Sequence, residues 1–174
     1  MTIQGLKRKV SFFIINHFLV STNKRVFGVK RYLLNWSGVK IGENSKIVGP
    51  IYISGNLNIG NNVWIGANFC VRGNGVVTIE DNCDIAPDVS FVTGSHEIGP
   101  KERRAGIGFN KDIKVGSGTW IGAYSKILGG VNIERGCVIA AGSVVNKNVS
   151  ENLLVGGVPT RIIRELSEVD KDDR

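Results

Sequence analysis

The sequence has few of the residues that build disulfide frameworks or metal centres. Its three cysteines are an odd number without a Cys-x-x-Cys pair, which argues against both kinds of site and fits a reducing, cytoplasmic setting. The apolar run at residues 10–20 covers only eleven positions, too few to span a bilayer. With 174 residues, 42% of them hydrophobic, the chain is long enough for one cored domain and too short for two large ones.

Acidic residues are absent from residues 1–40, which carry eight lysines and arginines. A signal peptide is not expected, because no small-residue cleavage site follows the apolar run. The mixture of aliphatic, phenylalanine and basic residues suits a helix at a membrane surface better than nucleic-acid binding. The alternative is a terminal helix that packs on the body of the protein or on a neighbouring subunit.

An aliphatic or aromatic residue recurs every six positions through most of the chain. The repeat fills fifteen positions without one polar residue. These positions are Ile41, Ile47, Ile53, Ile59, Ile65, Val71, Ile79, Ile85, Phe91, Val115, Ile121, Ile127, Ile133, Ile139 and Val145. A short fixed period of this kind predicts a repeat architecture in which each unit stacks on its neighbours.

Asparagine, aspartate or glycine stands three residues after thirteen of these fifteen positions, with Pro50 and Tyr124 as the exceptions. These residue types tolerate a left-handed backbone conformation. Each hexad therefore predicts a short strand with an inward aliphatic residue, followed by a tight corner. Three hexads close one triangular coil, and coils stack about 4.8 Å apart. The next position of each hexad is small or apolar, which places Cys83 and Cys137 in the expected core.

The repeat divides the chain into three parts. Residues 1–40 are expected to form a basic, amphipathic, helical arm, residues 41–150 about five coils, and residues 151–174 a C-terminal cap and tail. A two-residue slip and an excursion at residues 97–114 interrupt the coils. The excursion leaves and re-enters at one corner, so the stack continues past it.

Six short motifs stand in one order between residues 59 and 165. They are Gly66-Ala-Asn-Phe69, Ile85-Ala-Pro-Asp-Val89, Val92-Thr-Gly-Ser-His96, Trp120-Ile-Gly-Ala123, Ala140-Ala-Gly-Ser-Val144 and Gly156-Gly-Val-Pro-Thr-Arg-Ile-Ile-Arg164. Together they resemble the hexapeptide-repeat acyltransferases. Within that family they are most similar to the galactoside and maltose O-acetyltransferases and to the related capsule, colanic-acid and O-antigen acetyltransferases.

This resemblance implies both a fold and a reaction. It implies an all-β, left-handed parallel β-helix and a homotrimer whose active sites lie between subunits. The handedness comes from the resemblance alone, because parallel crossovers are generally right-handed. The resemblance also implies acetyl-CoA as the donor and no metal, and it places the family's catalytic histidine on His96.

Histidine suits the chemistry that this resemblance implies. A sugar hydroxyl is too weak an acid to attack a thioester while it keeps its proton, and a general base supplies about 10²–10⁴ in rate. Of the two histidines, His17 lies in the apolar N-terminal run, whereas His96 is expected at the corner where the loop leaves the third coil. The groups able to orient its ring are Glu97, Asp84, Asp88, Glu102 and a backbone carbonyl, and the sequence does not choose among them.

The resemblance also maps substrate-binding positions. It places an acceptor-binding asparagine on Asn68 and a tryptophan near both substrates on Trp120; the alternatives are an ordinary corner residue and a packed indole. The implied donor positions are Gly122, Ala123, Ala141, Gly142, Asn146, Lys147, Arg161 and Arg164. Small residues would let the pantetheine arm lie against the backbone, and cations would offset the nucleotide phosphates. The Ala123 amide would donate to the thioester oxyanion.

The excursion carries three cations, Lys101, Arg103 and Arg104. It would suit an arm that covers a neighbour's active site. The alternative is a solvated loop without a catalytic part.

Other activities known for this fold fit the sequence less well. A γ-type carbonic anhydrase needs three histidines around zinc, and only His96 lies in the repeats. A serine acetyltransferase carries a large helical domain before the repeats, which the forty residues of the basic arm do not supply. Nucleotide-sugar N-acetyltransferases usually carry a separate N-terminal nucleotide-binding domain, which the arm does not supply either. A noncatalytic β-helix scaffold would not need His96 or the Gly-Val-Pro-Thr-Arg motif.

The sequence therefore predicts an acetyl-CoA-dependent O-acetyltransferase acting on a sugar hydroxyl, in bacterial surface-polysaccharide biosynthesis. The alternative acceptors are a free oligosaccharide, a nucleotide-sugar amine and an antibiotic. The predicted location is the cytoplasm, with residues 1–40 bringing the enzyme to the inner face of the membrane. No nucleic-acid partner is expected.

Overall fold

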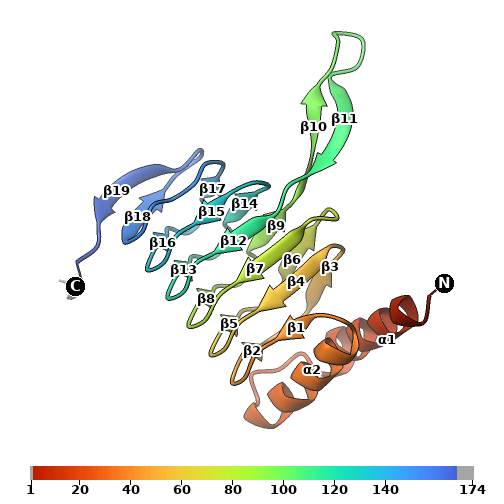
Figure 1. Cartoon of the computed structure of the whole chain (residues 1–174). Helices are drawn as coiled ribbons and strands as arrows, with labels where there is room; N and C mark the ends of the chain where they lie inside the picture. Colours follow the sequence, from red (N-terminus) through yellow and green to blue (C-terminus); the bar gives the residue numbers. More distant parts are fainter. Residues whose placement is uncertain (1, 168–174) are drawn as a thin grey trace.

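A computed structural model describes residues 2–167 and shows a prism of stacked triangular coils that follows two helices (Figure 1). The helices are α1 (Ile3–Phe18) and α2 (Lys24–Trp36). Within residues 2–167, neither helix is long and apolar enough to cross a membrane.

Three parallel sheets form the faces of the prism. Sheet A contains β1 (Lys40–Ile41), β4 (Asn56–Ile59), β7 (Val76–Ile79), β12 (Ile113–Val115) and β15 (Asn132–Ile133). Sheet B contains β2 (Lys46–Ile47), β5 (Trp64–Ile65), β8 (Asp84–Ile85), β13 (Trp120–Ile121), β16 (Val138–Ile139), β18 (Leu153–Gly156) and the antiparallel β19 (Arg161–Glu165). Sheet C contains β3 (Ile51–Ile53), β6 (Phe69–Arg72), β9 (Ser90–Val92), β14 (Lys126–Leu128) and β17 (Val144–Val145). The strands make five coils and part of a sixth.

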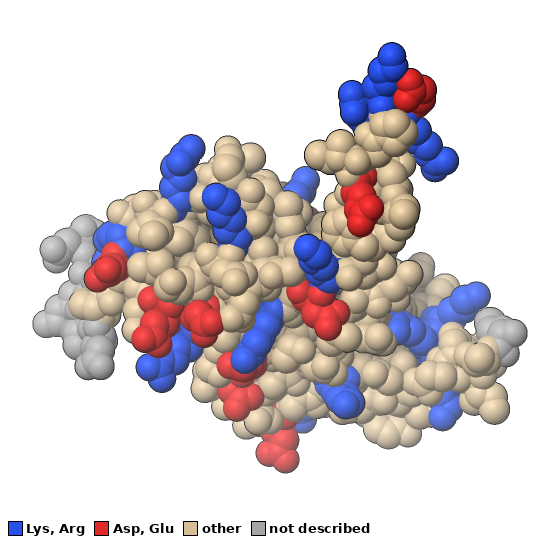
Figure 2. All heavy atoms as spheres, turned by 45° about the horizontal axis from the view of Figure 1, so that its top comes forward, with Lys and Arg blue, Asp and Glu red and all other residues tan. Residues whose placement is uncertain are grey.

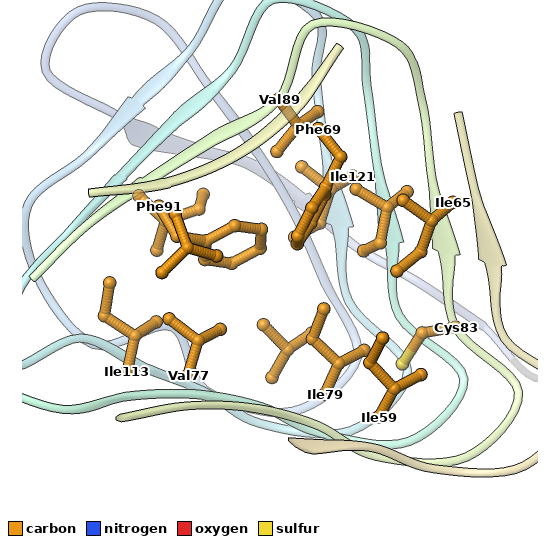
Figure 3. Packing of buried hydrophobic residues seen from close by; sticks show 14 of the residues in the cluster. Ile59, Ile65, Phe69, Val77, Ile79, Cys83, Val89, Phe91, Ile113 and Ile121 are labelled. Atoms are coloured by element: carbon orange, nitrogen blue, oxygen red, sulfur yellow. The ribbon is translucent and has the colours of Figure 1, made fainter. Parts of the chain in front are cut away.

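The hexad aliphatics line the inside of the prism (Figure 3). The register aligns them from coil to coil, as in the column Ile65, Ile85 and Ile121, and all three side chains are fully buried. Cys83 and Cys137 are also fully buried, which confirms their predicted core positions. Burial of this apolar surface is the main source of stability in a stack of such short strands.

The left-handed corners are confined mainly to two of the three edges. All five corner residues between sheets A and B have positive φ, namely Asn44, Asn62, Asn82, Gly118 and Gly136. Between sheets B and C the same holds for Asn68, Asp88, Tyr124 and Gly142. Between sheets C and A, Gly130 has positive φ, but Asn56, Asn74 and Asn148 do not. The asparagine pattern therefore marked a corner in each hexad correctly but not its backbone geometry.

A two-stranded hairpin leaves the prism at the edge between sheets C and A. Its strands are β10 (Gly94–Ile98) and β11 (Ala105–Asn110), and it projects away from the stack (Figure 1). The excursion thus begins at Gly94, earlier than residue 97. As a result His96 lies on the hairpin and not at the corner of the third coil, because Gly94 already pairs with Asn110.

The two N-terminal helices close the open end of the β-helix. The first coil has backbone groups that no earlier coil can satisfy. The Asn35 amide bonds the N–H and the C=O of Ile41 in sheet A, and the Asn16 amide does the same for Ile51 in sheet C. Each amide thereby replaces a missing strand.

Two basic side chains complete this cap. Arg8 donates to the carbonyls of Ile53 and Gly55, and the Lys30 ammonium donates to Ser21 O, Ile47 O and Val48 O at 2.9, 2.7 and 2.8 Å. The N-terminal arm therefore packs on the body, as its alternative interpretation held. Two of its eight bases face the β-helix instead of the surroundings.

Replacing Lys30 with methionine is expected to lower the free energy of unfolding by roughly 2 kcal/mol, because buried carbonyls lose their donor. Chemical denaturation measures the change. Lys9→Met is the control, since Lys9 is exposed and its removal should change the free energy by about 0.5 kcal/mol or less.

The same comparison has a pH dependence. Burial lowers the pKa of Lys30 from 10.5 to about 8. Between these values the unfolded chain binds a proton that the folded chain does not, so stability gains a pH-dependent part that grows as pH rises and is lost as pH falls through about 8. The hydrogen bonds of the ammonium group add to stability separately from this part. The free-energy gap between wild type and Lys30→Met should therefore widen from about pH 8 to about pH 10. A constant gap over this range contradicts the assignment.

Candidate functional site

The His96 imidazole is exposed on β10 and is oriented by the opposite strand of the hairpin. Its Nδ1 lies 2.9 Å from the carbonyl oxygen of Gly106. A carbonyl oxygen only accepts, so Nδ1 carries the proton in this contact and Nε2 keeps a free lone pair. The backbone carbonyl is thus the orienting group in the structure, whereas the sequence had left four carboxylates open as well.

Glycine at position 108 leaves room beside the imidazole. His96 and Gly108 are cross-strand partners, and a Cβ at position 108 would lie 3.5 Å from Cε1 of the ring. The hairpin tip beyond them carries the three cations and one acid, with Lys101 within 3.9 Å of Glu102. Figure 2 shows this mainly basic tip standing clear of the body.

The predicted substrate-binding residues gather on another edge, between sheets B and C. Asn68 forms the corner of the second coil and donates from Nδ2 to Asp88 Oδ1 at 3.0 Å, one coil further along. Ala123 and Gly142 continue the edge in the next two coils, where Gly142 N donates to Ala123 O at 2.8 Å. Ala141 and Gly142 are exposed, so a ligand can reach this edge.

Gly122 has a structural reason to be glycine. A Cβ there would lie 2.6 Å from Ala141 N and 2.8 Å from Ile139 O, so the next coil excludes any side chain. Gly142 differs, because nothing lies within 4 Å of its Cβ position and its φ of 70° explains the residue type. The glycine pattern alone does not separate these two causes.

Trp64, Asp84 and Trp120 form one row on the outer face of sheet B. They are register partners in three consecutive coils, and they line a cavity of about 320 Å³. Trp120 is 55% exposed, whereas the Trp64 ring packs edge-on against Phe27 of α2 at 5.9 Å. Trp120 is therefore available to a ligand on the outer face of sheet B, beside the B–C edge.

Two predicted phosphate-binding cations meet near the C-terminus. Lys147 and Arg161 line one cavity of about 380 Å³ between the last coil and β19. Asn146 precedes Lys147 and is exposed, and Arg164 stands opposite Leu154 in the β18–β19 pair. The donor positions thus run along the prism from the fourth coil to its C-terminal end.

Within a single chain, His96 does not lie on the edge that carries Asn68, Ala123 and Gly142. The histidine leaves the prism at the C–A edge, whereas Asn68, Ala123 and Gly142 lie at the B–C edge. The hairpin extends outward from its own stack (Figure 1). His96 and the predicted substrate-binding residues Asn68, Ala123 and Gly142 therefore occupy different edges of one prism.

Tyr124 is a candidate functional residue that the sequence analysis did not select. It holds a φ of 62°, which is unfavourable for a bulky residue, and 69% of its surface is exposed beside Ala123. Backbone strain of this kind clusters at functional sites. The available signal was an aromatic side chain in a corner position that otherwise holds Asn, Asp or Gly.

Within residues 2–167, no group of three or more His, Cys, Asp or Glu side chains is arranged to hold a metal ion. The expectation of a metal-free site stays a prediction.

Comparisons with known proteins agree with the fold. Residues 112–147 match the family model for the bacterial transferase hexapeptide (six repeats), and residues 57–86 match that for the hexapeptide repeat of succinyl-transferase. A galactoside O-acetyltransferase of Escherichia coli K12 is 37% identical over 133 residues, which are 75% of this chain. The match spans 66% of that relative's length, slightly under two thirds.

Two solved structures extend this likeness. A galactoside acetyltransferase in complex with coenzyme A matches 95% of this chain and 82% of its own, with a TM-score of 0.82 and 31% identity. The polySia-specific acetyltransferase NeuO matches 78% of this chain and 61% of its own, with a TM-score of 0.65 and 35% identity. The predicted family and the predicted left-handed parallel β-helix are thereby confirmed, and the chain belongs to the hexapeptide-repeat acetyltransferase family.

Proposed function

We propose that this chain is an acetyl-CoA-dependent O-acetyltransferase that acts on a saccharide hydroxyl. The observation that carries the proposal is the His96 geometry: a proton on Nδ1, fixed by Gly106 O at 2.9 Å, leaves Nε2 as the base. The likeness to acetyltransferases, one of them bound to coenzyme A, supports the donor.

The reaction proceeds as a direct transfer. The acceptor hydroxyl oxygen attacks the thioester carbonyl carbon while His96 Nε2 takes the hydroxyl proton. The Ala123 N–H donates to the oxyanion of the tetrahedral intermediate. The C–S bond then breaks, and the imidazolium returns its proton to the coenzyme A sulfur, which leaves the free thiol and the acetyl ester.

The pantetheine part of the donor lies along the B–C edge in this proposal, and its nucleotide part lies at the C-terminal end of the prism. The pantetheine arm passes Ala123, Ala141 and Gly142, and the nucleotide phosphates meet Lys147 and Arg161, which already share a cavity. Gly122, Asn146 and Arg164 complete the donor positions. Asn68 and Trp120 hold the acceptor at the same edge.

The active species is a homotrimer in this proposal. The separation of His96 from the B–C edge supports it, because a hairpin that projects from one prism can reach the substrate edge of another. Each site then takes its base from one chain and its substrate-binding edge from a neighbour.

The acceptor is proposed to be a sugar unit of a bacterial surface polysaccharide. The likeness to a galactoside O-acetyltransferase and to a polySia-specific acetyltransferase supports a saccharide. A free oligosaccharide, a nucleotide-sugar amine and an antibiotic are the alternative acceptors. Release of free coenzyme A thiol from acetyl-CoA, measured over a panel of these acceptors with mass spectrometry of the products, tests the proposal. If no acceptor in the panel yields an acetylated product, the result contradicts the proposal and favours the alternative of a noncatalytic β-helix scaffold.

Peripheral membrane binding through α1 is also proposed, for an enzyme located in the cytoplasm. Ile3, Leu6, Val10 and Phe13 recur at helical spacing and are each 40% or more exposed, so they form an outward apolar stripe. The arm has no acid to repel anionic lipid.

Replacing Leu6 and Phe13 with serine should reduce sedimentation with phosphatidylglycerol vesicles about tenfold or more. Both side chains are about half exposed and neither belongs to the buried core, so thermal stability should change little. Equal sedimentation of the variant and the wild type contradicts membrane binding through this stripe.

A further inference from the structure

A second and larger cavity lies between α2 and the outer face of sheet B. Its volume is about 630 Å³. Helix α2 contributes one wall, and the first three strands of sheet B contribute the other. Neither the proposed base nor the proposed donor positions lie in it, so the acetyl-transfer proposal gives it no role.

The cavity is strongly basic. Lys24, Arg25 and Arg31 of α2 and Lys46 of β2 line it, whereas Asp84 is its one acidic residue. None of these four cations forms an ion pair within residues 2–167. Four unpaired cations around one cavity repel each other, and a bound anion removes that repulsion.

The beginning of α2 adds to this positive potential. The helix starts at Lys24, and its first turn lines the cavity and contains no acidic residue. Asn23 caps this helix start and accepts from Arg25 N, so the contribution that remains is the positive end of the helix dipole, which favours negative charge. Fixed backbone dipoles and side-chain cations thus act in the same direction.

The basic cavity continues into the cavity between the two tryptophans. The two share Trp64 and Asp84. Lys46, Trp64, Asp84 and Trp120 are successive register partners across four coils. With coils about 4.8 Å apart, the tryptophans stand about 10 Å from each other along the prism axis, and the exposed Trp120 offers an apolar face to a sugar beside the B–C edge.

We propose that this cavity binds the diphosphate of a glycosyl diphosphate, so that the attached sugar lies on the outer face of sheet B along the row from Trp64 to Trp120, beside the B–C edge. This inference rests on the proposed function for the saccharide and adds its substrate class. Four cations against one carboxylate leave three positive charges in one place, which suits a compact, multiply charged anion.

The distribution of charge distinguishes this ligand from a carboxylate polysaccharide. Such a polymer carries one negative charge on each sugar and needs cations along its whole path. Beyond Asp84 the row on sheet B continues as Trp120, Val138 and Leu154, and meets a cation only at Arg164. The cations are therefore concentrated at the α2 end, as a terminal diphosphate requires.

Isothermal titration of the full chain with inorganic pyrophosphate tests the proposal. The double variant Arg31→Gln/Lys46→Gln should bind pyrophosphate about tenfold or more weakly than the wild type. Lys9→Gln/Lys126→Gln removes the same charge outside the cavity and should bind like the wild type. Equal dissociation constants for all three proteins overturn the proposal, as does tighter binding of a carboxylate oligosaccharide than of pyrophosphate.

Two further ligands separate the sources of the diphosphate. If uridine diphosphate binds more tightly than pyrophosphate, the ligand is a nucleotide sugar. If a short-chain prenyl diphosphate binds more tightly than pyrophosphate, the ligand is a lipid-linked sugar. Either result supports a glycosyl diphosphate. His96→Ala should bind pyrophosphate like the wild type, because the imidazole lies outside the cavity. Loss of acetyl transfer and loss of anion binding are therefore observed separately.

Discussion

His96→Ala is expected to lower kcat for acetyl transfer by about 10²–10⁴, the usual contribution of a general base. The reason is geometric. His96 Nδ1 lies 2.9 Å from the Gly106 carbonyl oxygen, which leaves Nε2 as the proposed base. The Michaelis constant for acetyl-CoA should change little, because the proposed pantetheine-binding positions Ala123, Ala141 and Gly142 lie on another edge. Stopped assays of thiol release with a responsive acceptor measure both constants.

His17→Ala is the matched control for this variant. His17 is the second histidine of the chain and is exposed on α1, where its Nδ1 bonds the Phe13 carbonyl at 2.9 Å. It has the same ring and the same kind of backbone contact but lies far from the hairpin in sequence. Its removal should leave kcat unchanged with a soluble acceptor. Unchanged turnover in His96→Ala would falsify the mechanism.

Much of the fold follows from the hexad pattern because each coil repeats the same local solution. An isoleucine every six residues predicts the buried column Ile65, Ile85 and Ile121. The same spacing predicts that Trp64 and Trp120 lie two coils apart, as the register shows. Sequence distance converts directly into position in such a stack, so core and outer rows are both predictable.

The hairpin did not follow from this pattern, because its strands bury little. Gly94–Ile98 is exposed or half-buried throughout, so no inward residue marks it. Gly94 also continues the corner series, which assigned the residues up to His96 to the third coil. The outward position of His96 thus depends on backbone pairing between β10 and β11, which the hexad period does not encode.

The contacts of the N-terminal helices with the first coil could not be predicted for a different reason. Asn16 bonds Ile51 across 35 positions, and Lys30 bonds Ile47 across 17. Such contacts depend on how the helices dock on the first coil. Composition alone presented Lys30 as one more base of a charged arm, although it is fully covered in the structure. The basic cavity beside α2 could not be predicted for the same reason.

The second large expected effect is recovery of activity in mixed oligomers, because the proposed active site combines the hairpin of one chain with the B–C edge of another. His96→Ala keeps an intact B–C edge but lacks the base. Ala141→Trp keeps the base but fills the donor edge with an indole, and the exposed position of Ala141 leaves the coil intact. Each variant alone should retain about 1% of wild-type turnover or less.

Co-assembly of the two variants should restore activity if each site combines the hairpin of one chain with the edge of another. In a random mixture the base comes from an intact hairpin in half of the sites, and the edge is intact independently in half. About one quarter of wild-type turnover should therefore return, a gain of about 25-fold or more over either parent.

Mixing the folded oligomers without subunit exchange is the control and should restore nothing. Mixed oligomers that native mass spectrometry confirms but that stay as inactive as their parents would place the base and the edge in one chain. Recovery near one quarter would show that the projecting hairpin serves a neighbouring prism.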